Sequence, residues 1–163
     1  MKNLIRATVL LLSIGLLSHV FAADQNSREM KITQKYLNLP IKNSDAKVWC
    51  EIAVDGMVVR GFDIQLAAEN PDYWVFADVS EFVGKSIVLS VKDGHPALEN
   101  IYQDDRFWGQ DSLYSEKYRP QFHFSSRRGW NNDPNGLVFY DGEYHLFYQH
   151  NPYSTNWGNM HWA

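Results

Sequence analysis

The alternation of apolar and polar residues between residues 30 and 91 is the feature that most constrains the fold. Apolar side chains recur at every second position, or form short runs, in the segments 37–41, 48–54, 62–66, 73–79 and 86–91. Such segments are typical of short strands, most of them with one buried face. Asp55-Gly56 joins two of them and favours a two-residue hairpin turn, because glycine tolerates a positive φ. We therefore predict a small antiparallel β-sandwich of five or six strands over residues 28–95.

The pattern changes twice after this predicted sandwich. Residues 96–117 mix turn formers, charges and isolated aromatic residues, as expected for a linker. From residue 118 onward the chain is rich in aromatic residues, and two apolar runs flank Asp141-Gly142, a second hairpin signal. A second β-rich region is therefore predicted over residues 118–163, which makes the whole chain all-β.

The N-terminus has the pattern of a secretory signal peptide. Lys2 and Arg6 precede an apolar stretch that ends in small and β-branched residues near Ala22. We predict cleavage near Ala22, with residues 1–22 as the signal peptide, and export to the periplasm, the cell surface or the medium. A membrane anchor is the weaker interpretation, because polar residues and a glycine interrupt a run that is already short for a bilayer span. No membrane span is predicted in the mature chain.

Charge and cysteine content narrow the range of partners. The net charge is -4, and removing residues 1–22 removes two basic residues and no acid, which gives -6. No basic stripe is present, which argues against nucleic acid or anionic lipid as a partner. Cys50 is the only cysteine, so no internal disulfide can form, and its place in an apolar strand predicts a buried, inert thiol.

The stretch "GWNNDPNG" poses the central question of whether Asp133 makes a turn or takes part in chemistry. Pro134 fixes φ and Gly136 permits a positive φ, so local geometry alone explains a tight turn. The hairpin signal that follows brings the chain back, and a regular hairpin would place Gln149 and His150 beside Pro134 and Asp133. A carboxylate and a carboxamide would then be neighbours, and both interpretations stay open on this basis.

The strings "RPQFHFSSRRGWNNDPNG", "FYQHNP" and "WGNMHW", within residues 119–162, resemble the opening of the catalytic domain of glycoside hydrolase family 32. This family comprises exported β-fructosidases, including invertases, inulinases and levanases. The resemblance implies that Asp133 is the nucleophile. It also implies a fructosyl subsite lined by Trp130, Asn131, Asn132, Gln149 and Trp157. Asn131 replaces the methionine common at its position, which leaves the role of Asp133 intact.

The resemblance also has consequences for the fold. The family fold is a five-bladed β-propeller, so residues 118–163 are expected to form the truncated first blade of the catalytic domain. The strings "YLNLPI" and "DVSEFVGK" resemble a small β-domain that precedes the catalytic domain in some exported bacterial fructan-degrading enzymes. The fold expected is thus an N-terminal small antiparallel β-sandwich followed by this truncated blade.

The mechanism of a retaining glycosidase requires a second carboxyl group, which protonates the leaving oxygen about 5 to 5.5 Å from the nucleophile. Asp141 and Glu143 are too distant in a regular hairpin, since eight strand residues span about 26 Å. The family's "E-C" and "R-D-P" strings, which carry its other two acidic residues, do not occur in the 163 residues. We therefore expect the N-terminal portion of an enzyme that hydrolyses β-fructans or sucrose, a portion that is inactive alone.

Metal and cofactor sites are not predicted. The spacings of His123, His145, His150 and His161 match no common ligand pattern, and structural histidines are the favoured interpretation. A different class of function stays open, namely a non-catalytic β-sandwich that binds glycan or packs on a partner and carries a vestigial blade. The residues do not discriminate among levan, inulin and sucrose, nor between endo and exo action.

Overall fold

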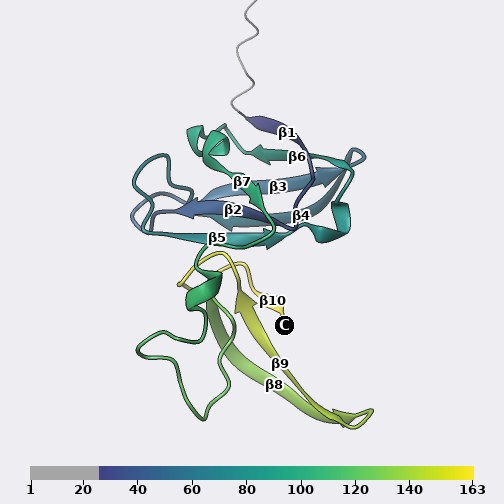
Figure 1. Cartoon of the computed structure of the whole chain (residues 1–163), viewed down its shortest axis with the longest axis vertical. Coiled ribbons are helices and arrows are strands. Elements are labelled where there is room, and N and C mark those ends of the chain that lie inside the picture. The colour runs from purple at the N-terminus through teal and green to yellow at the C-terminus, as the bar shows by residue number, and fades with distance from the viewer. Residues whose placement is uncertain (1–25) are drawn as a thin grey trace, which may run out of the picture.

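The computed structural model describes residues 26–163, which fold into a β-sandwich and a curved three-stranded sheet beneath it (Figure 1). The only helices within this range are three short 3-10 turns, so the predicted all-β fold is confirmed. The predicted signal peptide, residues 1–22, lies outside the described residues. From residue 26 onward, no helix has the length and apolar character to span a bilayer.

The sandwich consists of two antiparallel sheets. The larger sheet has four strands, in the spatial order β1 (Ser27–Lys31), β6 (Ser86–Val91), β3 (Val48–Val54) and β4 (Met57–Ile64). The smaller sheet has three strands, in the order β5 (Tyr73–Asp78), β2 (Tyr36–Ile41) and β7 (Tyr102–Asp104). The Asp55-Gly56 turn has φ values of 51° and 78°, which agrees with the hairpin predicted at this dipeptide.

The core lies between these two sheets and is built from the alternating apolar positions. Fully buried side chains include Leu37 and Leu39 of β2, Ile52 of β3 and Leu89 of β6. Each such side chain contributes about 1.5–3 kcal/mol when it leaves water. The period-two pattern therefore specifies the buried face of β3 and β6, whereas β2 is buried on both faces.

The sandwich extends beyond residue 95, into the segment expected to be a linker. The 3-10 turn η2 (Pro96–Asn100) buries Ala97 and Leu98, and β7 pairs with β2. Arg28 ties this segment to β1, since Nη1 donates to the carbonyl oxygens of Leu98 at 2.7 Å and Ile101 at 2.8 Å. A three-residue strand is too short to show a period, so β7 was not predicted.

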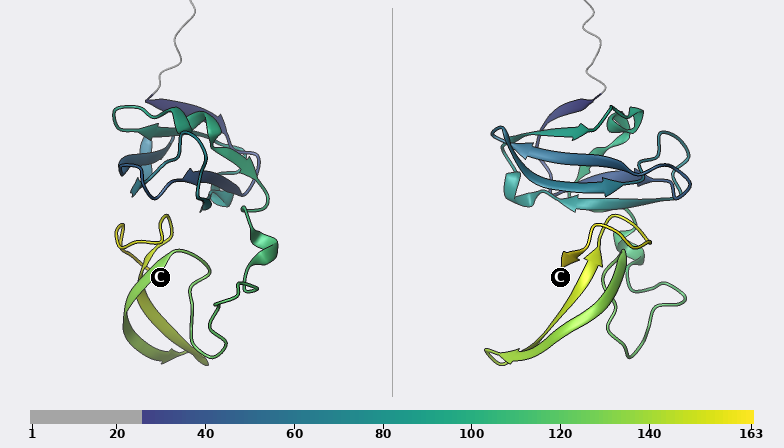
Figure 2. Two further views of the ribbon diagram at one scale, coloured as in Figure 1. Left: turned by 90° about the vertical axis from the view of Figure 1, so that its left-hand side faces the viewer. Right: turned by 180° about the vertical axis from the view of Figure 1, so that it is seen from behind.

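The second sheet has the order β10-β9-β8, with β8 (Trp130–Tyr140), β9 (Glu143–Asn151) and β10 (His161–Trp162). Asp141 and Gly142 form its tight turn with φ values of 48° and 82°, as the second hairpin signal predicts. A connection that includes η3 (Gln110–Ser112) leads into β8. Figure 2 shows that the β8–β9 hairpin curves away from the sandwich, while the segment between β9 and β10 lies next to it.

Candidate active site

Asp133 lies in β8 at a point where the strand is distorted. Its φ is 48°, and Gly136 has a φ of 66°. The pairing with β9 shifts twice here, between Asn132 and Asn135 and again between Asn135 and Leu137. Each shift leaves extra residues of β8 without a partner, which is the definition of a β-bulge.

These bulges make the expected register wrong. Gln149 lies opposite Asn132 and His150 lies opposite Asn131, rather than opposite Pro134 and Asp133. The physical reason is that the positive φ at Asp133 and the bulge at Gly136 insert residues on one strand only. Gln149 is still adjacent to the Asp133 segment, but it faces the residue before the carboxylate.

Three of the predicted subsite residues form a connected polar group. Trp130 Nε1 donates to Asn132 Oδ1 at 2.8 Å, and Asn132 Nδ2 donates to Gln149 Oε1 at 3.3 Å. Asp133 follows Asn132 directly and is exposed. Within residues 26–163 its side chain makes no hydrogen bond and no ion pair. The carboxylate is therefore free to meet a ligand.

Asn131 lies apart from this group. Ser126 Oγ donates to Asn131 Oδ1 at 3.2 Å, and both residues line a cleft of about 390 Å³ between β5 and the start of β8. Successive strand residues point to opposite faces, which accounts for the separation of Asn131 from Asn132. Asn131 thus lies where β8 meets the sandwich. Its role in the fructosyl subsite stays a prediction.

Trp157 lies in the segment between β9 and β10, and the residue is 64% exposed. Its carbonyl oxygen accepts a hydrogen bond from Lys47 Nζ at 3.4 Å. In the described part of the chain, the ring makes no hydrogen bond or ring contact with Trp130 or Gln149. The structure therefore joins Trp130, Asn132 and Gln149 by hydrogen bonds, whereas Trp157 is not part of this group.

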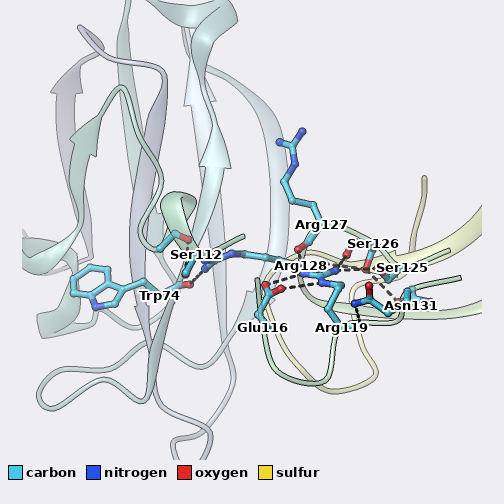
Figure 3. Close-up of polar contacts among 11 residues, drawn as sticks. Trp74, Ser112, Glu116, Arg119, Ser125, Ser126, Arg127, Arg128 and Asn131 are labelled. Carbon is cyan, nitrogen blue, oxygen red and sulfur yellow. Dashed lines mark hydrogen bonds and ion pairs between the residues drawn. The ribbon is translucent and has the colours of Figure 1, made fainter. Parts of the chain in front are cut away.

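An arginine cluster, which the sequence did not predict, fixes the chain before β8 (Figure 3). Arg119 donates to Glu116 through Nε at 3.0 Å and through Nη2 at 2.8 Å, to Ser125 Oγ at 3.0 Å, and to the Ser126 carbonyl oxygen at 2.8 Å. The hydrogen bonds from Arg119 lower the pKa of Glu116 to about 2. The segment that precedes β8 is therefore held by a network of charge-assisted hydrogen bonds.

Arg128 connects the sandwich to the hairpin. Its Nη1 donates to the Trp74 carbonyl oxygen in β5 at 3.3 Å, and its guanidinium lies 5.5 Å from the Phe107 ring centroid. The carbonyl oxygen of Arg128 lies 2.7 Å from His150 Nε2 in β9. Only the doubled arginine before "GW" could have signalled this role, because the partners are distant in sequence.

The histidines of the hairpin have structural contacts. His145 Nε2 lies 3.2 Å from the Tyr140 carbonyl oxygen, and His150 has the contact with Arg128. No group of three or more metal-ligating side chains is found among residues 26–163.

Two family models together cover all of the described residues. Residues 24–122 match the "Domain of unknown function (DUF4980)", and residues 123–163 match the "Glycosyl hydrolases family 32 N-terminal domain". The chain is thus a DUF4980 domain protein over most of its length. Its last 41 residues belong to glycoside hydrolase family 32.

Several curated relatives match part of the chain. The levanase of Bacillus subtilis (strain 168) is 63% identical over 52 residues, which are 32% of this chain and 8% of that protein. The sucrose-6-phosphate hydrolase of Zymomonas mobilis is 56% identical over 70 residues, 42% of this chain and 14% of that protein. The extracellular exo-inulinase inuE of Aspergillus niger is 53% identical over 50 residues, 31% of this chain and 9% of that protein. The chain therefore spans only a small part of the length of these relatives.

A solved structure of glycoside hydrolase family 32 from Bifidobacterium adolescentis also matches. It has a TM-score of 0.33 and 22% identity, and the match covers 84% of this chain and 25% of that chain.

Proposed function

We propose that this chain is the N-terminal portion of an exported glycoside hydrolase that cleaves terminal or internal β-fructofuranosyl bonds of fructans or sucrose with retention. In this proposal Asp133 is the nucleophile. The observation that carries it is the exposed Asp133 carboxylate, next to Asn132 within the group that Trp130 and Gln149 complete. The names of the relatives, which include a levanase, an exo-inulinase and a sucrose-6-phosphate hydrolase, support this class of substrate.

The chemistry of this group suits a fructosyl unit. Asp133 would attack the anomeric carbon and form a glycosyl ester, which water then hydrolyses. The carboxamides of Asn132 and Gln149 offer donors and acceptors to sugar hydroxyls. Trp130 is 38% exposed as a residue, and its ring would offer an apolar surface to the C–H face of the sugar.

The general acid is proposed to come from outside the hairpin. Asp141 occupies the tight turn at the far end of β8, and Glu143 starts β9 beside it. Neither carboxyl group can approach Asp133 along a strand of this length. Since a general acid contributes about 10² to 10⁴ in rate, residues 1–163 alone are proposed to release no fructose.

The surface of the hairpin is consistent with a blade of a larger propeller. Leu137, Phe139, Tyr144 and Phe147 are all exposed on β8 and β9. A single hairpin with such faces is marginally stable in water, so neighbouring blades are proposed to cover them.

The decisive experiment is Asp133→Asn in the full-length protein that contains this chain. Asparagine keeps the volume of aspartate and tolerates a positive φ, but it cannot form the glycosyl ester. We expect the variant to fold and to lose at least about 10³ in the rate of fructose release from levan, inulin and sucrose. Fructose release and the melting temperature are measured on the same preparation.

Asp141→Asn is the matched control. Asp141 has the same φ of 48° in a tight turn of the same hairpin, but it lies far from the group around Asn132. We expect wild-type activity in this control. A well-folded Asp133→Asn protein with near-wild-type activity would remove the catalytic role of Asp133 and leave it as a turn residue.

A further inference from the structure

The segment that carries Trp157 is packed onto the sandwich. We call residues 152–160, between β9 and β10, the Trp157 loop (Figure 1). Tyr153 of this loop is only 6% exposed and belongs to the hydrophobic core of the sandwich. Its ring stacks on Phe62 of β4 with the centroids 4.0 Å apart and an interplanar angle of 18°. The loop thus contributes an aromatic side chain to another domain.

The end of the loop is held by the edge of β4. Asp63 N donates to Asn159 Oδ1 at 2.7 Å, and Asn159 Nδ2 donates to the Asp63 carbonyl oxygen. β4 is an outer strand of its sheet, so its outward-facing backbone groups have no neighbouring strand within the sheet. The Asn159 carboxamide occupies both groups as a further strand would. Asn159 has a φ of 44°, a conformation that asparagine tolerates better than most residues.

Two further hydrogen bonds hold the backbone of the loop, one at Thr155 and one at Trp157. Thr155 N donates to the Tyr73 hydroxyl at 3.3 Å, and Lys47 Nζ donates to the Trp157 carbonyl oxygen at 3.4 Å. From the end of β9, the buried Asn151 donates through Nδ2 to the Asn156 carbonyl oxygen of the loop at 3.0 Å. The main chain is therefore held at Thr155, Asn156 and Trp157, and the Asn159 side chain holds the loop after Trp157.

Although its backbone is held by these contacts, Trp157 as a whole residue remains 64% exposed. A large apolar ring on a restrained backbone has already lost much of the conformational freedom that binding would otherwise remove. Such an arrangement favours a ring that is held ready for a ligand rather than one that contributes to the core.

We infer that the N-terminal sandwich, a domain of unknown function, is a positioning platform for Trp157, and that Asn159 is the positioning residue that couples the two. This inference rests on the proposed function and on the place in the fructosyl subsite that the family resemblance implies for Trp157. It assigns to the sandwich a role in substrate binding that requires no contact between the sandwich and the sugar.

Asn159→Gly in the full-length protein tests this coupling. Glycine accepts the positive φ of residue 159 but removes both hydrogen bonds to Asp63. If Trp157 contacts the sugar equally in the ground state and the transition state, its displacement weakens uniform binding. We expect KM for fructose release to rise about tenfold with kcat within about threefold of wild type.

Asn156→Gly is the matched control for backbone flexibility. It places the same glycine in the same loop, but the Asn156 side chain makes no hydrogen bond to any of residues 26–163, where only its backbone is used. We expect KM of this variant to stay within about twofold of wild type. A rise in KM equal to that of Asn159→Gly would overturn the inference, because loop flexibility alone would then explain both.

Hydrogen exchange of the Asp63 amide supplies a readout that does not depend on activity. We expect it to exchange at least about tenfold faster in Asn159→Gly and at the wild-type rate in Asn156→Gly. Unchanged exchange in Asn159→Gly would overturn the coupling contact. An active wild type whose KM is unaltered by Asn159→Gly would overturn the positioning role alone. A full-length wild type that releases no fructose would overturn the proposed function itself.

Discussion

Cys50 shows at the scale of one residue how burial determines reactivity. It lies in β3 between Phe62 of β4 and Val91 of β6, and it is fully buried. Burial raises the pKa of its thiol to about 12, with a smaller contribution from the charge of Glu51. The thiolate, which is the reactive form, is therefore scarce at any pH below that value.

We expect the folded protein to resist alkylation of Cys50 by iodoacetamide at about pH 8. Unfolding in denaturant restores an ordinary thiol pKa and solvent access, so we expect complete labelling of Cys50 in the unfolded protein. The extent of labelling is measured by intact mass. Labelling of the native protein at the rate of a free cysteine would show that the thiol is accessible.

The arrangement of polar residues around Asp133 could be foreseen only in part. The strings that resemble glycoside hydrolase family 32 identified Trp130, Asn132 and Gln149, which the structure joins by hydrogen bonds. The backbone of Asp133 was not predictable, because a positive φ is uncommon for residues other than glycine. The partner of Asn131 was not predictable either, since Ser126 is a loop residue without a pattern of its own.

At the scale of elements, β8 differs from the sandwich strands in how well the sequence specified it. The apolar alternation and the Asp-Gly turn were sufficient to predict β3 and β4 with their hairpin. The same signals predicted the β8–β9 hairpin but not its register, because bulges break the period that register depends on. Short elements such as β7 escape prediction because their position depends on distant partners.

The start of β8 is fixed by a glycine that has no room for a side chain. Gly129 and Gly142 share a φ of 82°, but a Cβ at Gly129 would collide with the Asn151 carbonyl oxygen, whereas nothing lies within 4 Å at Gly142. Gly142→Ala should cost about 1–2 kcal/mol of stability through backbone strain alone. We expect Gly129→Ala to cost at least about 1 kcal/mol more, because β8 and β9 must also separate.

This difference is measured by urea unfolding of both variants beside the wild type. Because the two glycines have the same φ, we attribute a difference in stability between the two variants to the collision with Asn151. Equal midpoints for the two alanine variants would show that β9 moves aside at little cost.

At the scale of the whole molecule, Tyr153 makes the two parts of the structure interdependent. Its ring completes the sandwich core against Phe62, although it belongs to the loop after β9. We expect Tyr153→Ala to lower the free energy of unfolding by about 3–5 kcal/mol, as for other large core side chains. Tyr118→Ala, at a tyrosine that is 86% exposed, should change it by less than about 0.5 kcal/mol.

Urea unfolding followed by both fluorescence and far-UV circular dichroism measures this effect. A small change in the free energy of unfolding for Tyr153→Ala would mean that the sandwich closes over Phe62 without the tyrosine ring. The sequence predicted two β-rich regions but not this contact, because Tyr153 stands in a loop where an aromatic residue has no period to indicate burial.

The hydrogen bonds of Asn159 to the backbone of Asp63 also bear on how separate molecules meet. An open strand edge can pair with the edge of a second copy, and this pairing is a common route to aggregation. Asn159 occupies the one outward N–H and C=O pair of Asp63 that a foreign strand would need at this position. The loop that presents Trp157 therefore also shields part of the sandwich from self-association.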